Sequence, residues 1–152
     1  MTHRPGPVVI DLPAEPAAPG CARELLRSLA ERSPDVRLRS EELDEVCVAV
    51  QEACSNAVRH GCGERPDARF RVEIHRRTDA LEVRVCDPGP GFSLGPCILP
   101  SPEALQEGGY GTFIMLSWMH EVTLERRGDE NVLVLVRRYG VPLATATEPA
   151  DA

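Results

Sequence analysis

Glu52 and Asn56, a carboxylate and a carboxamide four residues apart, are the side chains whose types and spacing best suit chemistry. A helix turns by about 100° per residue, so residues four apart lie on the same face. Carboxylate and amide oxygens accept protons, hydrogen bonds or metal ions. A Glu and an Asn at this spacing more often belong to a solvated helix face, so other segments must support the pair.

Two glycine-rich segments offer that support. Asp87 follows an alternating apolar segment and precedes Pro88-Gly89-Pro90-Gly91. A carboxylate fixed at a strand end can accept a hydrogen bond from an exocyclic amine, and glycines let the backbone approach a ligand closely. Further on, Gly108-Gly109-Tyr110-Gly111 opens an apolar helix, whose free N–H groups and positive dipole end suit phosphate. Taken singly, the two segments are ordinary turn and hinge chemistry.

The helix that must position Glu52 and Asn56 is predicted over residues 41–60. Ser40 is expected to cap its start, and Gly61 is expected to stop it in a left-handed conformation. Around the helix axis, Glu52 lies about 180° and Asn56 about 220° from Leu43, so both lie away from an apolar stripe. That stripe consists of Leu43, Val46, Cys47, Val50, Cys54, Ala57 and Val58.

The other elements follow from hydrophobic periodicity. Alternation predicts strands over 69–75 and 81–86 and a short edge strand over 8–12. It also predicts a hairpin of 122–125 with 132–136 around a turn at 128–131. The second strand of that hairpin is apolar throughout and is expected inside the sheet. Further helices are predicted over 21–32 and 112–120, and the apolar residues of the latter are expected in the core.

Length and composition limit the class of protein. A chain of 152 residues is about one domain. Its net charge is -7 and all its basic residues are Arg, and this charge balance argues against nucleic acid as the main ligand. No apolar run approaches a signal peptide or a membrane span, so the cytoplasm is the expected location. The cysteines include no CxxC pair and are expected to be reduced core residues: Cys21, Cys47, Cys54, Cys62, Cys86 and Cys97.

In this order and spacing, the segments together resemble the nucleotide-binding boxes of the GHKL ATPases, the superfamily of gyrases and histidine kinases. Over about residues 8–139 the chain is most similar to the anti-sigma-factor serine kinases of bacterial partner-switching systems. The specific marks are the run from Gln51 to Gly61 and the run from Gly109 to Val122. The resemblance implies a two-layer α/β sandwich of the Bergerat type, with a mixed, mostly antiparallel sheet and helices on one face.

The resemblance also implies roles for single residues. Asn56 would bind Mg²⁺, and Glu52 would either accept the proton of an attacking hydroxyl or orient that hydroxyl. Asp87 would receive the adenine amino group. The remaining nucleotide-binding residues would offer backbone groups or charge: Arg59, Gly89, Gly91, Gly109, Gly111 and Thr112.

The implied function is an ATP-dependent serine/threonine protein kinase with ATP and Mg²⁺ as cofactors. It would phosphorylate a STAS-type anti-sigma antagonist and, when not engaged with it, sequester a sigma factor; a homodimer is a further family expectation. Neither nucleic acid nor a membrane is expected as a direct partner. The domain plan is a flexible 1–7, an ATP-binding domain over 8–140 with a lid at about 92–108, and a disordered tail over 141–152.

Two other functions stay open. The segment 92–107 contains no Lys or Arg, so charge on the γ-phosphate would have to be matched by Mg²⁺, backbone N–H groups or Arg59. This departure favours a nonenzymatic module in which ATP only stabilises a partner-binding shape. The other alternative is a redox or metal protein built on the six cysteines, which their spacing hardly supports.

Overall fold

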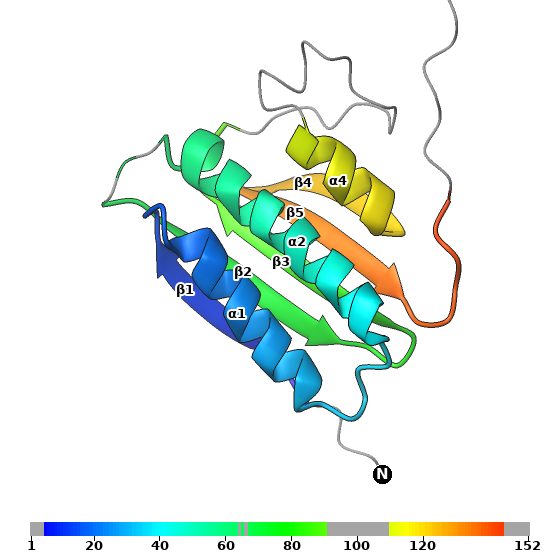
Figure 1. The fold of residues 1–152 in the computed structure, drawn as a ribbon. Coiled ribbons are helices and arrows are strands. Elements are labelled where there is room, and N and C mark those ends of the chain that lie inside the picture. Colours follow the sequence, from blue (N-terminus) through cyan, green and yellow to red (C-terminus); the bar gives the residue numbers. More distant parts are fainter. Residues whose placement is uncertain (1–4, 64, 66, 91–109, 145–152) are drawn as a thin grey trace, which may run out of the picture.

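A five-stranded sheet carries helices on one of its faces (Figure 1). It is seen in a computed structural model that describes residues 5–63, 65, 67–90 and 110–144. In chain order the described elements are β1 (Val8–Pro13), α1 (Ala18–Glu31), α2 (Ser40–Asn56), the π-helical turn η1 (Ala57–Gly61), β2 (Arg69–Arg76), β3 (Ala80–Asp87), α4 (Tyr110–Trp118), β4 (Glu121–Arg127) and β5 (Glu130–Arg138).

The strands pair in the order β1-β2-β3-β5-β4, and each described pair is antiparallel. The α/β sandwich is confirmed, whereas the described strands contain no parallel pair, so the expected mixed sheet is antiparallel in this part of the chain. β1 lies at one edge, as predicted. β5 lies between β3 and β4, which explains why residues 132–136 are buried on both faces of the sheet.

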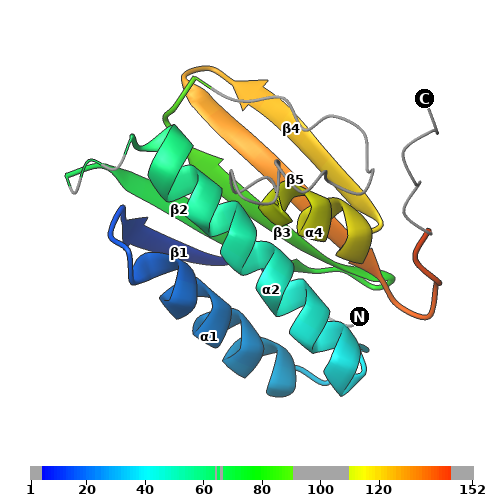
Figure 2. The same cartoon turned by 45° about the horizontal axis from the view of Figure 1, so that its top comes forward.

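The core lies between the sheet and the helices, with α2 between α1 and α4 (Figure 2). Strand alternation sends every second side chain into this layer. Phe70, Val72 and Ile74 of β2 are buried there, as the sequence predicts, and so is every residue of the predicted stripe on α2. The sheet therefore fixes the inner face of α2 and leaves the other sides of that helix for polar residues.

A buried arginine joins three of these elements. Arg137 of β5 is only 4% exposed, and its Nη1 donates to Glu45 Oε2 at 2.8 Å and to the Trp118 carbonyl at 2.9 Å. Its Nη2 contacts Glu42 Oε2 at 3.4 Å. Because Glu42 and Glu45 belong to α2 and Trp118 ends α4, this one guanidinium holds both helices against β5. The sequence analysis did not single out Arg137.

The start of α2 differs from the prediction by one residue. Arg39, not Ser40, is the N-cap, and its backbone N–H donates to Glu42 Oε1 at 2.8 Å in a capping box. That hydrogen bond holds the pKa of Glu42 below its ordinary value, although burial acts in the opposite direction. Ser40 is instead the first helical residue.

Acid is expected to remove the stabilisation that Glu42 gives to the start of α2. The folded pKa lies below the ordinary 4.5, so this stabilisation is complete above that value and is lost as the pH falls through the folded pKa. Glu42→Gln should cost about 1 kcal/mol at neutral pH, and the difference in stability from wild type should disappear as the pH falls below 4.5 and through the lower folded pKa. Thermal unfolding measured by circular dichroism checks this, with the exposed neighbour Glu41→Gln as control. A gap that does not change with pH would contradict the assignment.

Several predicted segments shift or lie outside the described residues. α1 starts at Ala18 rather than Cys21, and the hairpin turn narrows to Gly128-Asp129, because Glu130 and Asn131 belong to β5. The lid at about 92–108 lies outside the described residues, as does 145–152 of the expected tail. Among the described residues, none of the helices has the length and apolar character needed to cross a membrane.

Candidate functional site

Glu52 lies in the fourth turn of α2, half-buried beside the first turn of α4. A Cβ placed on Gly111 would lie 2.5 Å from Glu52 Oε2, so this carboxylate lies directly against the backbone of the first turn of α4. A cavity of about 630 Å³ opens on the α1 side of Glu52, and it is lined by Ala14, Pro16, Pro19, Glu52, Ser55, Val58 and Arg59. The carboxylate thus stands between a glycine-rich helix start and a cavity that an incoming group can enter.

Asn56 is the last α-helical residue of α2, one turn after Glu52. The turn η1 follows it at once, and the Cys62 N–H donates to the Ala57 carbonyl at 2.7 Å. Asn56 is 8% exposed rather than solvated, and its Oδ1 accepts a long contact of 3.4 Å from Arg59 Nη2. Single π-helical turns inside helices often occur at functional sites, because they re-aim the side chains around them.

Gly61 ends this turn for a reason other than the one predicted. Its φ is not among the positive values found at Gly63, Gly128 and Gly140, so the expected left-handed stop is wrong. A Cβ at Gly61 would overlap the Asp87 carboxyl group, and a Cβ at Gly89 would overlap the backbone of Gly61. The end of η1 therefore lies directly against Asp87, the last residue of β3, and glycine is required by close approach.

Gly61→Ala is expected to destabilise the protein and to weaken nucleotide binding together. The added methyl group must displace the buried Asp87, and overpacking of this kind costs about 1–3 kcal/mol. Urea unfolding and nucleotide titration measure the two effects. Gly20→Ala in α1 is the matched control, because a Cβ there meets open space. Equal stability of Gly61→Ala and wild type would show that Asp87 is free to move.

The remaining predicted residues are placed as follows. Gly89 and Gly111 are buried, Thr112 is half-buried and Arg59 is exposed. Gly91 and Gly109 lie outside the described residues. In α4 and just after it, Met115 and Met119 are core residues as predicted, whereas Phe113, Ile114, Leu116 and Trp118 are only half-buried, because the helix touches the core along one side.

Two polar residues beside Asp87 were missed by the sequence analysis. Asn131 is 3% exposed and donates from Nδ2 to Asp87 Oδ1 at 3.1 Å, and Arg126 donates to Asn131 Oδ1 at 3.0 Å. The run Gly-Asp-Glu-Asn predicted a turn, which concealed that Asn131 is a strand residue facing Asp87 across the sheet. A signal was present, since a polar residue directly before five apolar ones marks a strand end.

The cysteines do not form a redox or metal centre in the described residues. Burial raises the pKa of Cys54 to about 12 and those of Cys47 and Cys86 to about 11, so these thiols stay protonated at neutral pH. Among the described residues, no three His, Cys, Asp or Glu side chains gather to hold a metal ion. Cys21 is exposed, so its expected place in the core is wrong, and Cys97 lies outside the described residues.

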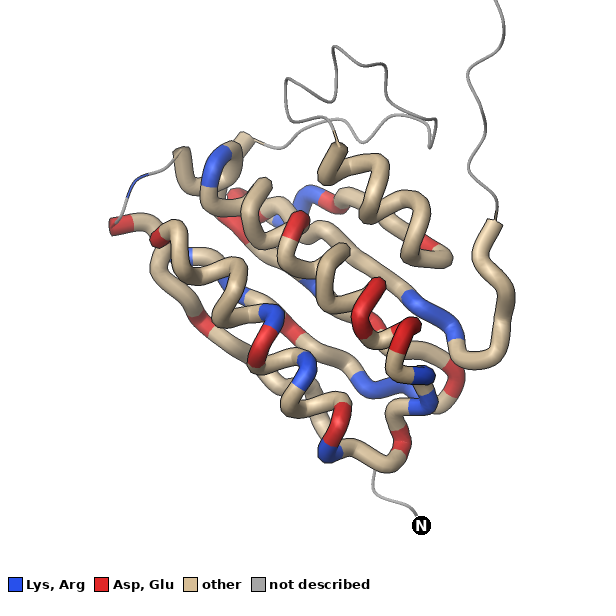
Figure 3. Tube along the Cα trace, in the orientation of Figure 1, with Lys and Arg blue, Asp and Glu red and all other residues tan. Residues whose placement is uncertain are grey.

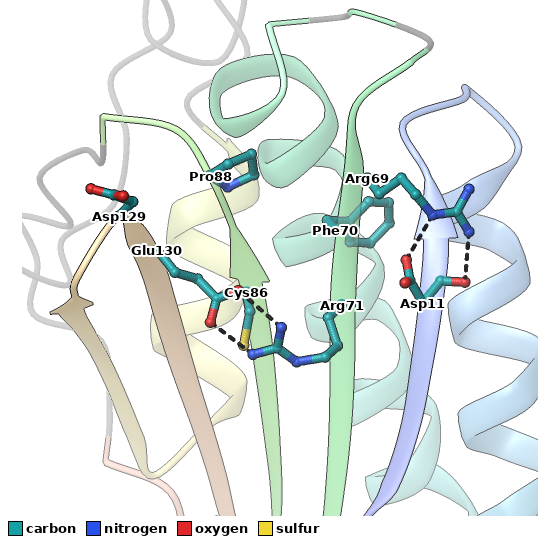
Figure 4. Close-up of a pocket in the computed structure, with 8 residues that line it drawn as sticks. All are labelled: Asp11, Arg69, Phe70, Arg71, Cys86, Pro88, Asp129 and Glu130. Atoms are coloured by element: carbon teal, nitrogen blue, oxygen red, sulfur yellow. Dashed lines mark hydrogen bonds and ion pairs between the residues drawn. The ribbon is translucent and has the colours of Figure 1, made fainter.

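A second cavity, of about 370 Å³, opens on the face of the sheet that faces away from the helices (Figure 4). Both guanidinium groups in it are already paired. Arg69 binds Asp11 at 2.9 Å, and Arg71 binds both Glu130 oxygens at 2.9 and 2.7 Å. These internal ion pairs leave little charge for a phosphate ligand. Over the described chain, basic and acidic positions are interspersed and do not form a single basic face (Figure 3).

Glu52 and Asn56 thus lie one turn apart on α2, and Asp87 of β3 meets the end of the following turn at Gly61. Gly61, where Asp87 makes contact, lies nine steps after Glu52, which corresponds to roughly 13–14 Å at the α-helical rise of about 1.5 Å per residue. This is the length scale of a nucleoside triphosphate. An acid that can take a proton, an amide oxygen that can bind a cation, and a buried acid that can take a base amino group are a set suited to phosphoryl transfer.

Comparisons with known proteins find a family and named relatives. Residues 12–137 match the histidine kinase-like ATPase domain family. The chain is 32% identical over 140 residues to the serine-protein kinase RsbW of Listeria innocua, covering 87% of this chain and 86% of the relative. It is 31% identical over 141 residues to the RsbW of Bacillus subtilis, covering 87% and 84%.

A solved structure shares the fold. The crystal structure of the RsbU and RsbW domains of a Mycobacterium tuberculosis protein superposes with a TM-score of 0.58 at 18% identity. The alignment covers 94% of this chain and 35% of the other, so this chain spans about a third of that protein. At this identity the similarity shows a common fold.

Proposed function

We propose that this chain, which belongs to the histidine kinase-like ATPase family and within it to the RsbW-type serine-protein kinases, phosphorylates a STAS-type anti-sigma antagonist and sequesters a sigma factor. Kinase activity follows from the family, whereas the antagonist and the sigma factor are our inference. The observation that carries the proposal is Glu52, whose carboxylate stands between the first turn of α4 and an open cavity.

In this proposal each residue acts on a different part of ATP. Asp87 receives the adenine amino group, and the free N–H groups at the start of α4 face the phosphates. Glu52 then takes the proton of the acceptor hydroxyl as that oxygen attacks the γ-phosphorus and the bond to the β-phosphate oxygen breaks. The cavity beside Glu52 is the route by which the acceptor segment reaches the carboxylate. The hydroxyl comes from the partner protein, so no nucleophile of this chain is needed.

The residues present fit a Mg²⁺ ion that the protein holds by one ligand. Asn56 Oδ1 is neutral and, within the part of the chain that the structure describes, takes one long contact of 3.4 Å from Arg59, so it keeps a lone pair for a cation. The described residues form no acidic cluster around it, which suits Mg²⁺, because this ion takes most of its ligands from water and phosphate oxygens. Bound there, Mg²⁺ would neutralise charge on the triphosphate.

Incubation of the purified chain with γ-labelled ATP and candidate STAS proteins tests the proposal. Labelled phosphate should appear on a serine or threonine of the antagonist, and the phosphorylated antagonist should no longer displace the sigma factor from this chain. Binding of ATP without transfer to any candidate would instead support the nonenzymatic module, which the absence of Lys and Arg from the sequence of 92–107 favours. Transfer to the antagonist with no capture of a sigma factor would limit the function to the kinase.

A further inference from the structure

A row of three polar residues crosses the end of the sheet. The strand register pairs Asp87 of β3 with Asn131 of β5, and Asn131 with Arg126 of β4. Residues paired across antiparallel strands point to the same face, here the face that the helices cover. This is shown by Val85, Leu133 and Leu124, which lie two residues away along the same three strands and pack in the core. The row is therefore on the nucleotide side of the sheet.

Hydrogen bonds fix the orientation of the Asn131 amide. Arg126 Nη1 donates to Asn131 Oδ1 at 3.0 Å, and Asn131 Nδ2 donates to the Gly89 carbonyl at 2.6 Å and to Asp87 Oδ1 at 3.1 Å. A flipped amide would place its NH₂ against a guanidinium and its oxygen against a carbonyl and a carboxylate, so only one orientation is compatible with these partners. Arg126 also donates to the Gly89 carbonyl and to the Gly128 carbonyl, which holds its side chain in place.

The same contacts leave Asp87 with one oxygen for a ligand. Its Oδ1 accepts from Asn131 Nδ2 and from the Gly89 N–H at 2.8 Å, so both hydrogen bonds that the carboxylate takes from the described residues reach this oxygen. Oδ2 is thereby turned away from β5. A carboxylate oxygen without a proton can only accept a hydrogen bond, so Oδ2 suits a donor on the ligand.

We propose that Asn131, locked by Arg126, is a specificity-determining positioning residue that aims Asp87 Oδ2 at the exocyclic amine of the nucleotide base. This rests on the proposed role of Asp87 and adds two residues that make no contact with the base. The site then favours a base that carries an amino group at that position and rejects one that carries a carbonyl oxygen, because two acceptors would face each other. Adenine and hypoxanthine differ in this one group, so ATP and ITP are the matched probes.

The test measures dissociation constants of both nucleotides, with magnesium, for the full chain and three variants. Asn131→Leu keeps a similar branched shape and removes the amide. Arg126→Met leaves Asn131 in place but releases its oxygen. Arg127→Met is the control: it removes a charge one residue along β4, where the side chain points to the other face and pairs with Glu125 at 2.7 Å.

Wild type should prefer ATP over ITP by about tenfold or more, as expected for a charged hydrogen bond against an unpaired acceptor. Asn131→Leu should weaken the binding of ATP and so reduce this preference by roughly fivefold or more, on the energy scale of a hydrogen bond. Arg126→Met should reduce the preference less, and Arg127→Met should leave it unchanged. In transfer assays the loss should appear in KM more than in kcat.

Three results would overturn the inference. They are equal binding of ATP and ITP by the wild type, a preference for ATP that is unchanged in both test variants, and an equal loss of affinity for ATP and ITP in those variants. If Asn131→Leu does not fold, Arg126→Met decides, because Arg126 is an exposed residue whose loss leaves the core intact. Binding is measured apart from transfer. A chain that selects ATP without phosphorylating any partner would therefore refute the proposed kinase function and leave this inference standing.

Discussion

Glu52→Gln is expected to lower the rate of phosphoryl transfer by about 10²- to 10⁴-fold, the range typical of a lost general base. The affinity for Mg-ATP should change little, because Gln has the same shape and the carboxylate faces the acceptor rather than the base. Single-turnover transfer to the antagonist and nucleotide titration separate the two quantities.

The size of this effect also separates the two roles considered for Glu52. A glutamine oxygen can still accept a hydrogen bond and orient the hydroxyl, but it cannot take the proton. A loss below about tenfold would therefore indicate orientation, and a loss of about 10²-fold or more would indicate proton transfer. Glu41→Gln, an exposed acid in the first turn of α2, is the matched control. Unchanged phosphorylation in Glu52→Gln would remove this residue from the catalytic mechanism.

Asn56→Ala should raise the magnesium concentration needed for half-maximal ATP binding by about 10- to 100-fold, in line with the effects of perturbing metal sites. The variant removes the one protein oxygen that we assign to the ion. Asn56→Asp is the matched control, since it keeps an oxygen in the same place and should retain tight magnesium dependence. A fluorescent ATP analogue titrated at several magnesium concentrations measures the shift.

The outcome of this titration distinguishes a metal ligand from a helix cap. Asn56 ends the α-helical part of α2, so its removal could also loosen η1. A looser η1 would weaken the binding of ATP by the same factor at every magnesium concentration, and Asn56→Asp would not restore that binding. A magnesium dependence equal to that of wild type would refute the ligand assignment.

The sequence predicted most of the elements because their periodicity is a local property. The stripe on α2 and the alternation in β2 and β3 each follow from which side chains must reach one core, and the structure confirms them. The apolar run of β5 also correctly predicted an interior strand. Element ends were less accurate: Arg39 replaced Ser40 as the cap because the Glu42 carboxylate reaches its backbone N–H.

Contacts between distant segments could not be predicted from these patterns. That Gly61 must be glycine depends on the approach of Asp87, 26 residues later, and nothing local distinguishes this from an ordinary helix stop. Arg137 and Asn131 likewise acquire their roles only when β5 pairs with β3 and meets the helices. Periodicity shows which face is buried, whereas the order of strands decides which polar residues meet.

A structure of the full chain with a nonhydrolysable ATP analogue and Mg²⁺ tests the central claim most directly. The account predicts the base amino group at Asp87 Oδ2, the phosphates at the start of α4, the ion on Asn56 and the γ-phosphate beside Glu52. An analogue bound in the cavity on the other face of the sheet, or bound without contact to these three side chains, would contradict it.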